Sequence, residues 1–277
     1  MTNVTGSAPA QAARQGGEKV VRSSGFEWLS RAGFVARGLI YGIIGVLALR
    51  LAIGQGGRTT NQQGAIHTVA HQPLGKVLLT LLAVGLGGYA LWRFARAAIG
   101  HGPEGSDGTF DRIAAFASGI VYAGFFIVAV KVLIGAKGSS STPKTASRDA
   151  FGWPAGTWIV AAAGLIVIGV GLYQAYRGLT HDFLKDSKTE QMSPRMKRWI
   201  SMLGMVGHLA RAVVFTLVGI FLVKAAVDYN PRTAIGLDGA LAKLQHNSFG
   251  PFLLALVALG LIAFAFYSFS DARYRRI

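Results

Sequence analysis

One pattern of residues occurs three times in this chain, and it constrains the fold more than any local motif does. Each copy is a long apolar segment that opens on a signature of small residues and closes on a basic residue. The copies align without a gap and run from Arg31 to Arg50, from Arg112 to Lys131 and from Met205 to Lys224. A second apolar segment follows each copy. A repeat of this length predicts an array of three two-helix units.

The composition indicates that these helices lie in a membrane. Of the 277 residues, 52% are hydrophobic and only 14% are charged, whereas soluble domains carry about a quarter charged residues. The segments are unbroken and rich in Ala, Leu and Gly, unlike the alternating strands of a membrane barrel. Six of them reach the ~20 apolar residues that a span requires, near residues 34–54, 74–98, 113–135, 157–176, 203–227 and 249–270. The sequence therefore predicts an all-α polytopic membrane protein with six transmembrane helices.

The repeat also predicts how the helices are organised. Because every unit contains two spans, all three units enter the membrane in the same direction, as three parallel two-helix repeats related by an axis along the membrane normal. We therefore expect a pseudo-threefold bundle, with small-residue pairs such as Gly38 and Gly42 at helix contacts inside it. The expected segments are a disordered cytoplasmic N-tail (1–30), repeat one (31–100), repeat two (112–180), repeat three (201–271) and a basic C-tail (272–277).

The distribution of charge predicts the orientation. The net charge is +16, and most basic residues fall in the N-tail, the second loop, the fourth loop and the C-tail, which lie on one side. Basic loops mark the cytoplasmic face, so both termini are expected in the cytoplasm. The membrane is expected to be the plasma membrane. The partners expected there are anionic lipid headgroups. A nucleic-acid partner would require a folded basic domain, for which no loop is long enough.

Several motifs together resemble a known family. They are the opening signature Gly33–Tyr41, the connector Gly64–Gly75, the closing motif Gly169–Tyr176 and the ending Asp271–Arg276. With them the chain resembles, over residues 30–277, the bacterial membrane family called domain of unknown function 1206. The resemblance implies three tandem two-helix units in an integral protein of the bacterial envelope. It implies no activity and carries no catalytic residue over to this chain.

The candidate site is a set of repeated cations. Arg50, Lys131 and Lys224 fall in one column of the repeat, near the extracytoplasmic end of the first helices. Arg37 and Arg211 share a second column near the other end. Because the acidic residues Asp228 and Asp271 come at helix ends, we expect these cations to lack a carboxylate partner inside the membrane. Rings of such cations select anions in pores. The spacing favours interfacial anchoring instead, since Arg37 and Arg50 lie only about 20 Å apart along a helix and both can reach headgroups.

Two functions follow from these features. The first is a structural or accessory membrane protein that contacts anionic lipid or a protein partner through its basic face. The alternative is a small-anion or polar-solute permease lined by the first helix of each repeat. We expect no enzymatic activity, because no acid–base cluster or catalytic motif is found. The chain has no cysteine, which excludes thiol chemistry, and His67 and His71 have no third ligand nearby, so neither a metal nor a cofactor is expected.

Overall fold

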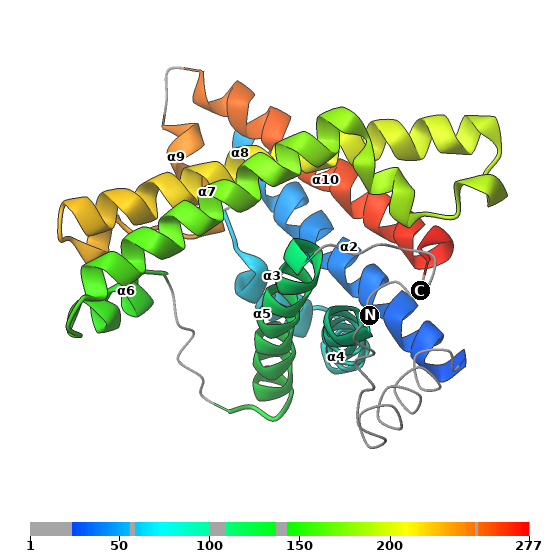
Figure 1. Ribbon diagram of the computed structural model, residues 1–277, viewed down its shortest axis with the longest axis horizontal. Coiled ribbons are helices and arrows are strands. Elements are labelled where there is room, and N and C mark those ends of the chain that lie inside the picture. The colour runs from blue at the N-terminus through cyan, green and yellow to red at the C-terminus, as the bar shows by residue number, and fades with distance from the viewer. Residues whose placement is uncertain (1–23, 56–58, 100–108, 137–142, 247–248, 277) are drawn as a thin grey trace, which may run out of the picture.

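The computed structural model describes residues 24–55, 59–99, 109–136, 143–246 and 249–276. Across these residues the fold is helical and contains no β-strand (Figure 1). Each of the six long helices is long and apolar enough to cross a membrane, which confirms the predicted fold class. These helices are α2 (Ser24–Ala52), α4 (Gly75–Ile99), α5 (Thr109–Leu133), α7 (Gly156–Thr180), α8 (Pro194–Val227) and α10 (Gly250–Tyr274).

Short helices fill the connections. Within each repeat one nine-residue helix joins the first long helix to the second: α3 (Gln62–Ala70), α6 (Pro143–Phe151) or α9 (Leu237–Gln245). The loop between α7 and α8 contains the 3₁₀ turns η1 (Asp182–Asp186) and η2 (Thr189–Gln191), and η3 (Pro231–Thr233) follows α8. Each repeat therefore consists of a first helix, a connector helix and a second helix.

Two helices begin earlier than the sequence predicts. The first, α2, starts at Ser24, so residues 24–30 of the expected disordered tail are helical; residues 1–23 lie outside the described residues. The second, α8, starts at Pro194, because Ser193 caps it by accepting a hydrogen bond from the Met196 amide and proline suits a first helical position. Its 34 residues span about 51 Å, which exceeds the ~30 Å hydrocarbon core. The first turns of α8 therefore extend beyond the core.

The long helices are arranged with approximate threefold symmetry. The second helix of each repeat packs along the first helix of the next, which gives the pairs α4/α5, α7/α8 and α10/α2 (Figure 1). Contacts within these pairs are equivalent: Gly38 faces the Phe269 ring in α10/α2, and Gly119 faces the Phe94 ring in α4/α5. The glycines are thus contact points between helices of one chain, where they permit close approach.

Two arginines repeat one capping interaction. Arg31 donates hydrogen bonds to the carbonyl oxygens of residues 272–273 at the end of α10, at 2.5 and 2.8 Å. Arg112, its repeat equivalent, donates to those of residues 97–98 at the end of α4, at 2.8 and 2.6 Å. The last carbonyls of a helix have no partner within the helix, so each arginine satisfies the end of the preceding repeat's helix. The third repeat has Met205 at this position.

The ring of helices is open at repeat two. The two long helices pack together in repeat one (α2/α4) and in repeat three (α8/α10), whereas α5 and α7 form no packed interface within the described residues. A Cβ atom added to Gly33 would lie 2.5 Å from Tyr89 Cβ, and one added to Gly207 would lie 2.7 Å from Phe264. The equivalent residue of α5 is Ala114. A side chain in place of this glycine is incompatible with the close packing that the other two repeats use.

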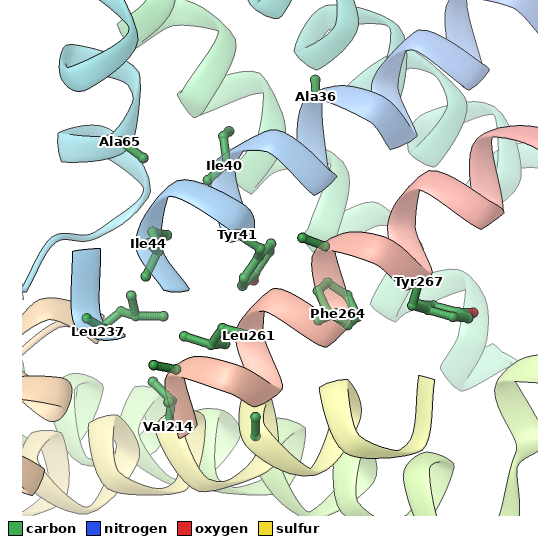
Figure 2. Close-up of a cluster of buried hydrophobic side chains, with 14 of the residues drawn as sticks. Ala36, Ile40, Tyr41, Ile44, Ala65, Val214, Leu237, Leu261, Phe264 and Tyr267 are labelled. Carbon is green, nitrogen blue, oxygen red and sulfur yellow. The ribbon is translucent and has the colours of Figure 1, made fainter. Parts of the chain in front are cut away.

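The main hydrophobic core lies where α2, α8 and α10 meet (Figure 2). Tyr41 of α2 contacts Phe264 of α10 edge to face, with ring centroids 4.9 Å apart. Ile44, Leu261 and Val214 continue this core, and the connector helices α3 and α9 cover its end with Ala65 and Leu237. The least buried spans are α5 and α7, as expected from the missing contact between them.

Candidate functional site: an arginine-rich cavity between the repeats

A cavity of about 1080 Å³ lies between the long helices, all six of which contribute lining residues. It extends from the α7–α8 loop to Gln62 at the start of α3. Two columns of the repeat line it: first Arg37, Ser118 and Arg211, and one turn further along, Tyr41, Tyr122 and Phe215. Because equivalent residues of all three repeats line the same space, the cavity lies on the axis that relates the repeats.

The structure separates the two predicted cation columns. Arg37 and Arg211 line the cavity, whereas Arg50, Lys131 and Lys224 are exposed and do not line it. Helical geometry explains the separation, because a residue 13 positions further along a helix points about 140° away. The placement of the outer three favours interfacial anchoring, and that of the inner two favours a binding role.

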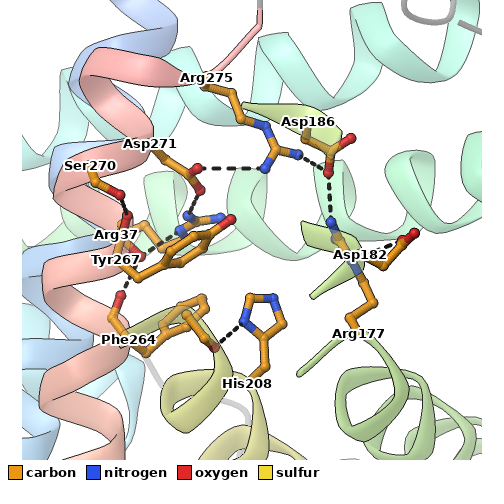
Figure 3. Close-up of polar contacts among 12 residues, drawn as sticks. Arg37, Arg177, Asp182, Asp186, His208, Phe264, Tyr267, Ser270, Asp271 and Arg275 are labelled. Carbon is orange, nitrogen blue, oxygen red and sulfur yellow. Dashed lines mark hydrogen bonds and ion pairs between the residues drawn. The ribbon is translucent and has the colours of Figure 1, made fainter. Parts of the chain in front are cut away.

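Arg37 has a carboxylate partner, contrary to the sequence-based expectation. Its Nη2 atom lies 2.6 Å from Asp271 Oδ2, and its Nη1 atom donates to the Tyr89 hydroxyl at 2.9 Å. Asp271 does lie in the last turn of α10, as predicted, but its side chain is only 1% exposed. The prediction was wrong because Arg275 and the α7–α8 loop cover this helix end and bury the carboxylate with Arg37 (Figure 3).

A second carboxylate, that of Asp186 in the α7–α8 loop, forms ion pairs with three arginines at one end of the cavity. Arg177 and Arg275 contact its Oδ2 atom at 2.6 and 2.8 Å (Figure 3). Arg96 lies 3.7 Å from Oδ1. Burial opposes ionisation of Asp186, but the charges of Arg275 and Arg177 outweigh it and hold the pKa of this carboxyl well below its ordinary value. The network joins α4, α7, the loop and the end of α10.

Cations exceed carboxylates in the cavity wall. Among the described residues, nine Arg and Lys side chains and four Asp and Glu side chains line it. Arg211 has no carboxylate within ion-pair distance in the described part of the chain. Its guanidinium lies 4.3 Å from the centre of the Phe264 ring, and Gln174, in the amide orientation that satisfies both groups, accepts from Nη1 at 2.7 Å. Within the described ranges, Arg93 donates only to the Tyr89 hydroxyl, from Nε at 3.2 Å and from Nη2 at 2.9 Å.

Sequence reasoning missed part of this site. From the sequence, Arg93 and Arg177 belong to the basic residues of the second and fourth loops and their flanks, which indicate orientation, yet both line the cavity. A signal for them was present, because each follows a tyrosine by four residues at the same position of the second helix: Tyr89 with Arg93, and Tyr173 with Arg177. A spacing of four places both residues on one helix face, where the arginine and its tyrosine point into the same space.

His208 lies in the cavity wall as a buried packing residue. Its Nδ1 atom lies 2.8 Å from the Gly204 carbonyl oxygen, and its ring stacks on Phe183 with centroids 4.9 Å apart. No group of three or more His, Asp and Glu side chains suited to a metal ion occurs among the described residues. The wall of the cavity therefore offers cations, carboxylates, aromatic rings and the side-chain amides of Gln62, Gln174 and Gln191.

Comparison with known proteins gives a family but no activity. The family described as Domain of Unknown Function (DUF1206) matches the chain three times, at residues 32–111, 113–181 and 206–275. An "Uncharacterized protein YxxB" from Bacillus subtilis (strain 168) is 32% identical over 250 residues, which cover 89% of this chain and 90% of that protein. No solved structure matches. The three family matches coincide with the three repeats α2–α4, α5–α7 and α8–α10, so the repeat is a property of the family pattern.

Proposed function

The chain belongs to the family described as Domain of Unknown Function (DUF1206), and for this member we propose that the arginine-rich cavity binds an anion within the membrane, as the binding step of a transport function. We propose binding and transfer rather than catalysis, since the four carboxylates of the described cavity wall are each paired with an Arg or Lys side chain. The geometry thus supports the permease alternative more than the accessory role.

One observation carries the proposal: Arg211 faces the cavity on the repeat axis with no carboxylate partner among the described residues. Arg211 is half-buried, and removing a charge from water is costly unless the charge is paired. Among the described residues its partners are limited to an amide oxygen and aromatic rings. An anion beside Arg211 would supply the missing counter-charge. Intramembrane cations that lack a protein partner commonly mark ion or substrate pathways.

The chemical class of the anion follows from the groups that would hold it. Guanidinium groups bind planar carboxylate and tetrahedral phosphate oxygens through two parallel hydrogen bonds. The volume of about 1080 Å³ corresponds to the upper end of small-molecule sites, roughly 300–1,000 Å³. An organic anion with a phosphate or carboxylate group therefore suits the cavity better than a halide does.

The setting of the site is also part of the proposal. We place the protein in the plasma membrane with both termini cytoplasmic, supported by the even number of candidate spans and by the basic residues on that side. The end of the cavity at the α7–α8 loop then faces the cytoplasm. Lys197 and Arg198, which are exposed at the start of α8, remain candidates for contact with anionic headgroups.

The test is anion-dependent stability of the purified full chain in phosphatidylcholine nanodiscs. Inorganic phosphate should raise the unfolding midpoint of the wild type at constant ionic strength, because a ligand at 100 times its Kd stabilises by about 2.7 kcal/mol. The variant Arg211→Gln should lose this increase. The matched control Arg50→Gln should keep it, because Arg50 does not line the cavity. A wild-type midpoint that responds no more to phosphate than to chloride would overturn the proposal.

A further inference from the structure

We infer that the cavity takes its anion from the bilayer: its occupant is an anionic phospholipid that enters sideways between α5 and α7, with its headgroup at Arg211 and Arg177. This inference rests on the proposed anion-binding function and adds the source and class of the ligand. Three features of the molecule support it: the opening between the two helices of repeat two, the polarity of its walls, and the position of the cations.

The opening is specific to repeat two. In repeats one and three the first and second helices pack through glycines, whereas α5 and α7 form no packed interface in the described part of the chain. A Cβ added to Gly33 or Gly207 would clash with the facing helix, while one added to Gly169 of α7, the equivalent of Gly85, would meet nothing within 4 Å. The cavity thus has a side that no helix of the described chain covers.

The walls of this opening change from polar to apolar with depth. Towards the end of the cavity at the α7–α8 loop the facing residues are Ser118 of α5, and Gln174 and Arg177 of α7. Further from this end they are Val121 and Phe125 of α5, and Val167 and Val170 of α7. Arg177 and Val167 are separated by about 15 Å along the helix axis. Charge at the membrane face and apolar side chains towards the bilayer centre match a lipid with its headgroup at the face and its chain inward.

The lateral opening distinguishes a lipid from a water-soluble anion. A soluble anion requires only the end of the cavity at the α7–α8 loop, and an apolar side opening would add nothing to its binding. A lipid requires an uninterrupted passage for its chain, since moving apolar chain through a polar seal is unfavourable. Val121 and Val170 are exposed and also line the cavity, so one surface is continuous from the lipid phase to the arginines.

The lipid inference is tested by measuring which lipids lie next to the opening between α5 and α7. The chain has no cysteine, so Val170→Cys in the full chain can carry a single bimane label in nanodiscs. Quenching is compared between nitroxide-chain phosphatidylglycerol and nitroxide-chain phosphatidylcholine. The reference is Leu165→Cys, which lies on the same helix, is exposed and does not line the cavity. The ratio of the two lipids at each position removes the effect of depth.

We expect the preference for phosphatidylglycerol at Val170→Cys to exceed that at Leu165→Cys roughly fivefold, the gain from one cation–headgroup interaction. Arg211→Gln should remove the excess, whereas Arg50→Gln and the surface variant Lys197→Gln/Arg198→Gln should leave it unchanged. Equal preferences at the two labelled positions overturn the inference. An excess that survives Arg211→Gln overturns the headgroup placement, and an excess lost only in the surface variant assigns lipid selection to the surface of α8.

The phosphate-stabilisation experiment distinguishes failure of the lipid inference from failure of the proposed anion binding. If phosphate stabilises the wild type but not Arg211→Gln, and no lipid preference occurs at Val170→Cys, the cavity binds a water-soluble anion and only the lipid inference fails. If neither effect occurs, anion binding fails as well. If Val170→Cys is shielded from both lipids and the protein elutes as a dimer, a second copy covers the opening and the lipid inference is wrong.

Discussion

At the scale of single residues, equivalent positions of the repeats perform equivalent tasks. Gly33 and Gly207 allow the first helix of repeats one and three to approach the second helix, and Arg31 and Arg112 satisfy the end of the preceding helix. These roles depend on the absence of a side chain or on a guanidinium, so they are sensitive to conservative substitution.

Gly33→Ala should destabilise the protein by about 1–3 kcal/mol, because the new Cβ would lie 2.5 Å from Tyr89 Cβ and 2.8 Å from the Gly85 carbonyl oxygen. The measurement is reversible unfolding in mixed detergent micelles. Gly124→Ala is the control, since its Cβ would meet nothing within 4 Å and alanine is the better helix former. If both substitutions have the same effect, close packing at Gly33 does not determine stability.

The candidate site was predictable only in part, and particular residues show why. The gap-free repeat identified Arg37 and Arg211, because an equivalent position in a symmetric array faces the same axis. The repeat also placed Arg50 in the same candidate site, because an alignment of sequences does not show which way each residue points around its helix. Gln174 and Asp271 were missed, because their partners lie on other helices, at Arg211 of α8 and Arg37 of α2. Such contacts depend on how α7/α8 and α10/α2 pack, which no local pattern encodes.

At the scale of elements, the α7–α8 loop is held to the C-terminal segment by backbone hydrogen bonds and ion pairs. Ser187 forms an antiparallel bridge with Arg275 after α10, Lys188 N donates to the Tyr274 carbonyl oxygen at 2.7 Å, and Asp186 collects arginines from α4, α7 and the C-terminal segment. The sequence predicted a basic loop here. It could not predict these contacts, because the two residues of a contact are up to 90 positions apart in the sequence, as for the hydrogen bond from Arg276 N to the Asp186 carbonyl oxygen.

Asp186→Asn should weaken these contacts, at a cost of about 3 kcal/mol at pH 7, since it removes the nearest carboxylate from Arg177 and from the buried Arg275. The arginines hold the pKa of Asp186 below its ordinary value. The carboxylate therefore contributes its full stabilisation above the unfolded-state pKa of ~3.9 and loses it as the pH falls from there through the lowered folded-state pKa.

The measurement is the free energy of unfolding of both proteins between pH 7 and pH 3. The difference between wild type and Asp186→Asn should be constant down to about pH 5 and shrink below about pH 4. Lys185→Gln is the matched control in the same turn, because Lys185 pairs with Asp182 and is mostly exposed. A difference that stays constant to pH 3 would show that the ionised carboxylate is not what stabilises the loop.

At the scale of the whole molecule, the opening through which we propose that a lipid enters is a departure from symmetry. Three equivalent helix pairs build the ring. Each pair contributes one residue of the column Arg37, Ser118 and Arg211 to the cavity wall. Repeat two differs at the positions that close the other two: Ala114 replaces the glycine seen at Gly33 and Gly207, and Leu172 replaces Gly88. Symmetry therefore places equivalent residues around the cavity, and the departure at repeat two leaves α5 and α7 without a packed interface in the described part of the chain.

Restoring the glycines should close the ring. In Ala114→Gly/Leu172→Gly, α5 and α7 can approach as α2 and α4 do, because the side chains that prevent contact are gone and glycines promote helix packing in membranes. Spin labels at Val121→Cys and Val170→Cys, in the otherwise cysteine-free chain, report the separation by electron–electron distance measurement. The labelled pair should shift to shorter distances than in the parent protein, and phosphatidylglycerol should lose its preference for the opening. Gly124→Ala, on an open face of α5, should leave the distances unchanged. An unchanged distribution in the double glycine variant would show that the connector α6, and not the two helix faces, holds α5 and α7 apart.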